Sequence, residues 1–403
     1  MEEGEVAVRR TEIPAVDWLL ALAIASCAAL VAHLVYGTAD SGSDLAVYHG
    51  GASAVAHGHS LYAFASYNGL QFTYPPFAAV FLVPIGLLPI GAAVPVWAAV
   101  CTLALEATVW IVLGAVGVRG RRRALFAAAG TVAAFSLAPI SSNFWTGQIN
   151  TILMLLIVAD LARPGGQRQQ QQRRWRWRGV GVGIAAGLKL TPLIFVPYLL
   201  FSRQVRAGVT AAATFAATVL AGFAVMPGGS WRYWRHDVWS TKRIIPVDDA
   251  WGFDQSILGA FKRVRNYLPA TPLWLVLAVV TGVVGLALAI RASRHGEELT
   301  GVVICAITGL LVSPVSWPFH WVWCVPLLIL GAARAWRDGL TREKAGVVAL
   351  WLAFALASIW TFAVFFLDPG NPGPVLVTLF ADLFVLIGLG MLAVLAYRTV
   401  SSR

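Results

Sequence analysis

Long apolar segments are the feature that most constrains how this chain can fold. Runs of the length that a bilayer-spanning helix needs, about 17–25 residues, recur from Val16 to Tyr397. The chain is 58% hydrophobic and 12% charged, with a mean hydropathy of +0.73. A soluble domain of 403 residues needs more charge than this to cover its surface. The sequence therefore predicts an all-α polytopic membrane protein.

The basic residues indicate how the spans are oriented. The net charge is +11, and most of the surplus lies in short clusters between apolar runs. Placing all of these clusters in the cytoplasm satisfies the positive-inside rule, so the charge reports topology and does not indicate a nucleic-acid partner. The clusters are Arg9–Arg10, Arg119–Arg123, Arg163–Arg178, Arg203 with Arg206, Arg291 with Arg294, Arg334–Lys344, and Arg398 with Arg403.

The chain predicts a single integral membrane domain over residues 1–403. We expect Val16–Tyr36 to be a retained helix and not a signal peptide. A first extracytoplasmic loop covers 38–91, where 77–91 forms interfacial or re-entrant helices, and a second covers 227–270. A basic cytoplasmic loop covers 164–178. The expected spans are 16–37, 92–118, 124–141, 147–163, 179–190, 191–202, 206–226, 271–291, 300–316, 320–337, 345–367 and 375–397.

The spans 179–190 and 191–202 are too short to cross about 30 Å of hydrocarbon separately. Pro192 breaks the helix between them. We interpret them as two half-helices that meet at Lys189-Leu190. Lys189 is then a lone cation at their junction. It either reaches the headgroups or contacts a lipid-linked phosphate beside the positive N-terminal end of the next helix.

Asp44 is the strongest catalytic candidate, because it follows the first span at the expected outer face. It is either the N-cap of a helix that begins at Leu45 or a general base that removes a proton from a hydroxyl. The nearby Tyr48 and His49 make this loop polar and aromatic, as sugar stacking requires. His320 opens a span on the same side after two prolines, and ionisable groups at such positions tend to be functional.

Other polar residues on this side are candidate ligands of a substrate. Gln148 and Asn150 either cap and bridge helices or bond sugar hydroxyls. The cations Lys262, Arg263 and Arg265 either contact a phosphate or anchor the chain to anionic lipid. Cys27, Cys101, Cys305 and Cys324 lie in apolar spans and indicate neither disulfides nor metal ligands. We expect no metal and no cofactor, and no nucleotide-binding or hydrolase motif is present.

Several of these segments, taken in order, resemble glycosyltransferase family 87. They are Asp44-Leu45-Ala46-Val47-Tyr48, Leu61-Tyr62, Tyr74-Pro75-Pro76-Phe77, Gly147-Gln148-Ile149-Asn150, Gly187-Leu188-Lys189-Leu190-Thr191-Pro192, Gln255-Ser256, and Ser313-Pro314-Val315-Ser316-Trp317 with His320. The resemblance implies a GT-C fold and a multi-pass bacterial plasma-membrane enzyme whose active site faces outside. It also implies that Asp44 is essential for transfer.

The resemblance further implies the substrates. Polyprenyl-phosphate-mannose is the expected donor, a mannosylated glycolipid the acceptor, and membrane lipids surround the protein. Taken with the residues discussed above, the candidate substrate contacts are Tyr48, His49, Tyr62, Tyr74, Gln148, Asn150, Lys189, Asp254, Gln255, Ser256, Lys262, Arg263, Arg265 and Trp317. Two positions depart from the family pattern: Phe319 replaces the first histidine of a pair, and Asp254 replaces an asparagine.

Two other functions fit parts of the same pattern. An arabinofuranosyltransferase that uses decaprenyl-phosphate-arabinose would share the architecture. A lipid or glycolipid transporter would instead need paired charges at mid-membrane and inverted repeats. Glu106 lies in a span without an obvious cationic partner in the sequence, and no repeat is apparent. The sequence therefore favours an inverting α-(1→2)-mannosyltransferase.

Overall fold

The described part of the protein is helical. The structure is a computed structural model, and it describes residues 43–63, 65–66, 69–162, 177–240, 253–264, 272–367 and 381–401. Within these ranges the only extended pairing is a single bridge between Ala65 and Gln71. The expected all-α fold class is therefore confirmed for this part of the chain. The predicted first span, 16–37, lies outside the described residues, as does Arg265.

Among the described residues, five helices are long and apolar enough to cross a bilayer. They are α5 (Ile90–Ala115), α11 (Val205–Val225), α14 (Pro272–Arg294), the continuous pair η6 (Pro318–Trp323) and α16 (Cys324–Asp338), and α19 (Leu383–Ser401). Shorter apolar helices lie between them: α8 (Asn150–Leu161), η2 (Thr191–Ile194) with α10 (Phe195–Phe201), and α15 (Glu298–Val312). Helix α17 (Thr341–Leu367) packs beside α16.

The span that we predicted at 124–141 is two helices in the structure. Helix α6 (Gly120–Ala134) and helix α7 (Ala138–Thr146) meet at an angle of 74°. Leu137 is extended, and Pro139 in the first turn of α7 cannot donate a backbone hydrogen bond to a preceding helix. The next helix then begins at Asn150 and not at 147. The bend therefore leaves Gly147 and Gln148 in a tight turn between α7 and α8.

The segment 77–91 contains no helix of spanning length. It forms α3 (Pro76–Phe81) and α4 (Val83–Gly86), and α5 begins at Ile90. Both short helices pack against α2 (Ser43–Ala56). A Cβ added at Gly86 would lie 2.6 Å from the backbone nitrogen of Ser53, so only glycine allows this approach. Short helices therefore occupy the segment for which the sequence predicted interfacial or re-entrant helices, and their position in the membrane stays a prediction.

The predicted break at Lys189-Leu190 is present. Helix α9 (Val180–Leu188) ends there, and Lys189 adopts an extended conformation with φ −152° and ψ 133°. Helix η2 follows, with Pro192 in its first turn. Helix α9 lies against α11, where an added Cβ on Gly187 would lie 2.2 Å from the Thr218 hydroxyl. This close packing fixes where along α11 the chain leaves helix α9.

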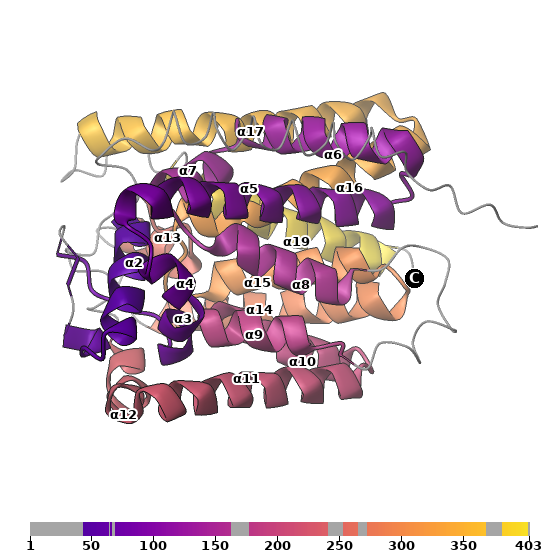
Figure 1. Ribbon diagram of the computed structural model, residues 1–403. Helices are drawn as coiled ribbons and strands as arrows, with labels where there is room; N and C mark the ends of the chain where they lie inside the picture. The colour runs from indigo at the N-terminus through magenta and orange to yellow at the C-terminus, as the bar shows by residue number, and fades with distance from the viewer. Residues whose placement is uncertain are drawn as a thin grey trace, which may run out of the picture.

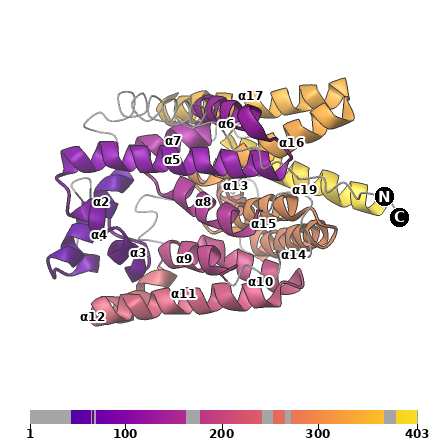
Figure 2. The same cartoon turned by 45° about the vertical axis from the view of Figure 1, so that its right-hand side comes forward.

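The described parts of the two predicted extracytoplasmic loops gather at one end of the helices. Figure 1 shows α2, α3 and α4 at the same end as α12 (Pro227–Arg235), although they lie far apart in the sequence. Figure 2 shows the same grouping from a second direction. We call this the α2 end. At the opposite end, α14 turns into α15, and α19 finishes there.

Candidate active site

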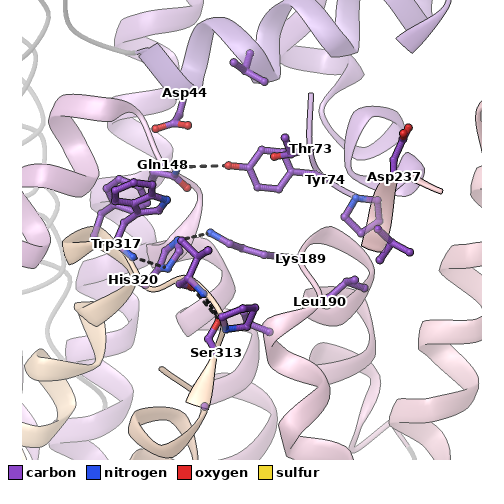
Figure 3. Close-up of a pocket in the computed structure, with 18 of the residues that line it drawn as sticks. Asp44, Thr73, Tyr74, Gln148, Lys189, Leu190, Asp237, Ser313, Trp317 and His320 are labelled. Carbon is purple, nitrogen blue, oxygen red and sulfur yellow. Dashed lines mark hydrogen bonds between the residues drawn. The ribbon is translucent and has the colours of Figure 1, made fainter. Parts of the chain in front are cut away.

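A cavity of about 500 Å³ lies at the α2 end. Its walls come from α2, the 70–75 segment, the α7–α8 turn, the α9–η2 break, the residues after α12, and the loop between α15 and η6. Figure 3 shows Gln148 and Tyr74 pointing toward each other, and Lys189 pointing toward His320. Six predicted site residues line this cavity: Asp44, Tyr74, Gln148, Lys189, Trp317 and His320.

Asp44 places a carboxylate at one side of the cavity (Figure 3). Helix α2 begins at Ser43, so Asp44 lies inside the first turn and not in the capping position before it. Burial raises the pKa of Asp44 from 3.8 to about 6, while a hydrogen bond with Gln148 and the positive charge of Lys189 act in the opposite direction. The carboxylate is therefore ionised at neutral pH and more basic than an exposed aspartate.

Gln148 connects the residues around Asp44. Its Oε1 accepts a hydrogen bond of 2.9 Å from the Tyr48 hydroxyl, and its Nε2 lies 3.4 Å from the Tyr74 hydroxyl. The Asp44 carboxylate can only accept, so its hydrogen bond with Gln148 turns the NH₂ end of the amide toward Asp44 and leaves Oε1 facing Tyr48. The NH₂ group of Gln148 is thus directed toward the cavity side, where Asp44 and Tyr74 lie.

The turn that carries Gln148 depends on a glycine. Gly147 ends α7 with φ +73°, a conformation that other residues adopt only with strain. Its carbonyl accepts a hydrogen bond of 2.8 Å from Trp97 Nε1, and a Cβ at this position would lie 2.6 Å from Leu45 Cβ. Because Leu45 follows Asp44, this contact also fixes the distance between the two sides of the site.

Lys189 and His320 form the basic side of the cavity. Lys189 Nζ lies 2.8 Å from His320 Nε2 and donates to Asn150 Oδ1 at 3.2 Å. The backbone N–H of Trp317 donates to His320 Nδ1 at 3.2 Å, so the ring is held from both sides. Nζ also lies 5.7 Å from the centre of the Tyr74 ring. These contacts direct a basic pair into the cavity, as binding of an anionic group requires.

Asp254, Gln255 and Ser256 do not line the cavity. Asp254 Oδ1 accepts backbone hydrogen bonds from Ser316 (2.9 Å) and Ser256 (3.1 Å). The Gln255 backbone N–H donates to Ser316 O at 2.6 Å. All three residues are buried. They hold the loop that precedes Trp317 and His320, so their contacts in the structure are with protein and not with the cavity.

Four further predicted contacts also lie outside the cavity wall. Tyr62 lies behind Tyr74 and donates its hydroxyl to the Tyr74 carbonyl at 2.9 Å. His49 Nε2 is 2.8 Å from Leu88 O. Arg263 forms an ion pair with Asp382 and donates to Asp254 O at 2.8 Å. Lys262 lies in the last turn of α13 (Ile257–Val264) and is absent from the lining.

The cavity also includes residues that the sequence did not single out. Tyr233 and Asp237, from α12 and the turn after it, line the wall, as does Thr73. Tyr233 stacks on Tyr62 with ring centroids 5.5 Å apart, and Asp237 pairs with the exposed Arg232 at 3.3 Å. The sequence pattern that could have identified Asp237 is the one that identified Asp44, namely an acidic residue that follows a predicted span.

The described residues contain no group of three or more His, Cys, Asp or Glu side chains that could hold a metal ion. The polar side chains of the cavity are instead arranged as a carboxylate and a basic pair, linked by a tyrosine–glutamine network. This arrangement can take a proton from a hydroxyl and stabilise a nearby phosphate.

Comparison with known proteins gives a consistent result. The model of glycosyltransferase family 87 matches residues 72–314. A polyprenol-phosphate-mannose-dependent α-(1-2)-phosphatidylinositol mannoside mannosyltransferase of Mycobacterium tuberculosis is 35% identical over 363 residues, which cover 85% of this chain and 82% of that protein. A polyprenol-phosphate-mannose-dependent α-(1-2)-phosphatidylinositol pentamannoside mannosyltransferase of Mycolicibacterium smegmatis is 33% identical, over 79% of this chain and 78% of that protein. No solved structure matches the chain.

Proposed function

Because the chain belongs to glycosyltransferase family 87, we propose that its cavity transfers mannose from polyprenyl-phosphate-mannose to the 2-hydroxyl of a mannosylated glycolipid. The enzyme class follows from the family and from the named mannosyltransferases that the chain resembles. The acceptor is a phosphatidylinositol mannoside or lipomannan. The single observation that carries the mechanism is the placement of Asp44 and the Lys189–His320 pair on the wall of one cavity.

Asp44 is the general base of this reaction. It takes the proton of the acceptor 2-hydroxyl as the oxygen attacks the anomeric carbon of the donor. The bond between that carbon and the phosphate oxygen breaks, and its electron pair leaves with polyprenyl phosphate. A β-linked donor that gives an α-linked product requires inversion. One displacement and one base are therefore sufficient, without a covalent intermediate.

Lys189 and His320 stabilise the leaving group. Negative charge grows on the phosphate as the glycosidic bond breaks, and donors placed at such a point commonly contribute a few kcal/mol. Lys189 is held by Asn150 and His320 by the Trp317 backbone, so neither side chain must reorganise during the step. We propose that the basic pair contacts the donor phosphate and that the sugar lies between it and Asp44.

Apolar residues on one wall fit the lipid part of the donor. Leu190, Ile194, Val312 and Pro314 line the cavity beside Lys189. They come from the α9–η2 break and the end of α15. A polyprenyl chain that enters past these residues would bring its phosphate to the basic pair. We further propose, from the charge pattern of the chain, that the α2 end faces away from the cytoplasm in a plasma membrane.

The test is a transfer assay with the purified chain. Labelled polyprenyl-phosphate-mannose is supplied with a panel of mannosylated lipids, and the linkage of the product is determined. We expect an α-(1→2)-linked mannose on at least one phosphatidylinositol mannoside or lipomannan acceptor. Transfer from decaprenyl-phosphate-arabinose, and not from the mannose donor, would contradict the proposed substrate while retaining the enzyme class.

A further inference from the structure

A second cavity lies at the end of the helices opposite to the active site. Its volume is about 290 Å³, close to the lower end of the roughly 300–1,000 Å³ that ligand pockets commonly span. It is formed where the end of α14, the start of α15, the end of α16 and the end of α19 come together. Figure 1 shows these ends far from α2. No step of the proposed transfer reaction uses this cavity.

Positive charge converges on this cavity from three helices. Arg291 comes from α14, Arg334 from α16 and Arg398 from α19. One carboxylate, Glu297, lines the same cavity and forms an ion pair with Arg334. Three guanidinium groups and one carboxylate leave a net charge of +2. The Arg291 guanidinium makes no hydrogen bond or ion pair with the described residues, so an anion could bind to it without displacing a protein partner.

The remaining wall of the cavity is apolar. Leu288, Ile304 and Leu395 line it together with the arginines. The same helices present exposed apolar side chains toward their middles, including Val284 of α14 and Val394 of α19. An exposed apolar face next to a basic recess matches an acyl chain next to a phosphate. A soluble anion would make no favourable contact with this apolar surface.

We propose that the cavity binds the phosphate headgroup of an anionic phospholipid. Arginine recognises phosphate oxygens with paired N–H donors, and basic recesses between membrane helices are known sites for acidic headgroups. Figure 1 shows the starts of α6 and α11, where the basic clusters Arg119–Arg123 and Arg203 with Arg206 lie in the sequence, at the same end of the molecule as this cavity. The positive-inside rule therefore places the site in the cytoplasmic leaflet, across the membrane from the proposed transfer reaction.

Scattered basic residues at the cytoplasmic ends of helices commonly only determine the orientation of the spans in the membrane. Arg337 is an example, because it lies on α16 one turn from Arg334, is exposed, and does not line the cavity. The cavity arginines differ from it in lining one shared recess. Arg337 therefore serves as a matched control, because its removal changes the net charge equally.

The test compares lipid binding by Arg291→Gln and Arg337→Gln in the full chain. Purified protein in a neutral detergent is titrated with phosphatidylglycerol or phosphatidylcholine, and bound lipid is counted by native mass spectrometry. We expect phosphatidylglycerol to bind in preference to phosphatidylcholine. We expect Arg291→Gln to weaken that binding about fivefold, and Arg398→Gln to add a similar loss, whereas Arg337→Gln has little effect.

Two further measurements keep the result interpretable. Thermal unfolding in detergent without added lipid identifies a variant that fails to fold. Arg291→Lys keeps the positive charge but not the paired N–H donors, so it should restore part of the binding. Inorganic phosphate is titrated in a separate arm. Three results would overturn the proposal. They are equal losses of phosphatidylglycerol binding in Arg291→Gln and Arg337→Gln, equal binding of both lipids, and stabilisation against thermal unfolding by inorganic phosphate without lipid binding.

Discussion

Lys189 Nζ lies 2.8 Å from His320 Nε2, although the two residues are 131 positions apart in the chain. The opposite ring nitrogen of His320 accepts the Trp317 backbone N–H, and Lys189 is held by Asn150. Nζ and Nε2 are therefore held within hydrogen-bond distance of each other on the wall of the cavity. The pair acts as one basic unit, and its two members should not contribute independently.

We expect Lys189→Met and His320→Gln each to raise the KM for the polyprenyl donor by about tenfold or more, because each removes a proposed partner of the donor phosphate. The double variant should lose less than the product of the two single losses, since each single change already disrupts the pair. Steady-state kinetics with varied donor concentration measures this. Fully multiplicative losses would show that the two residues act separately.

We expect Asp44→Asn to reduce kcat by about 10²–10⁴-fold, the contribution that a general base commonly makes. Donor binding, measured by equilibrium binding of labelled polyprenyl-phosphate-mannose, should remain nearly unchanged. Asp237→Asn is the comparison, because Asp237 lines the same cavity but is paired with Arg232. It should retain more activity than Asp44→Asn. Turnover by Asp44→Asn close to that of the unmodified enzyme would remove Asp44 from the base role.

The acid side of the pH profile should report Asp44. Burial raises the pKa of Asp44 to about 6, and only the ionised carboxylate accepts a proton. Below that pH the carboxylate is increasingly protonated, so kcat/KM should fall by roughly tenfold for each further pH unit. Above it the carboxylate is ionised, and this dependence should level off. An acid limb centred near pH 4, as for an exposed aspartate, would contradict the buried setting.

Asp254 should position the site without touching substrate. Its Oδ1 holds the Ser316 backbone, directly before Trp317 and His320. Asp254→Ala removes this acceptor. It should lower kcat, measured at a saturating donor concentration, by about tenfold, and it should change the KM for the acceptor by a smaller factor. Asp254→Asn keeps an oxygen at Oδ1 and should retain most activity. A substrate-binding role for the charge would instead make Asp254→Asn as inactive as Asp254→Ala.

Gly147→Ala should destabilise the protein. An alanine at φ +73° costs about 1–2 kcal/mol, and its Cβ would in addition lie 2.6 Å from Leu45 Cβ. Gly339 supplies the control, because it has φ +72° and no atom within 4 Å of an added Cβ. Thermal unfolding in detergent should show a larger decrease for Gly147→Ala than for Gly339→Ala. Equal decreases would mean that the Leu45 contact relaxes freely.

The sequence predicted the helical class and the break at Lys189 because both depend on local properties, namely apolar run length and proline. It also identified Asp44, Lys189 and His320, which are ionisable groups in unusual places. It did not separate the residues that line the cavity from those that support it. Asp254 and Arg263 are polar and near helix ends, but their partners Ser316 and Asp382 are distant in sequence. Tertiary contacts of this kind leave no local pattern.

The break between α9 and η2 has a consequence for when the site exists. Pro192 has no backbone N–H, and its ring would collide with the carbonyl four residues earlier, so joining the two helices would cost about 3 kcal/mol. Residues 180–201 are thereby prevented from closing into one continuous rod. The lysine at the gap is held at the cavity by the fold itself, so the proposed anion-binding side of the cavity is formed by folding, before any lipid arrives.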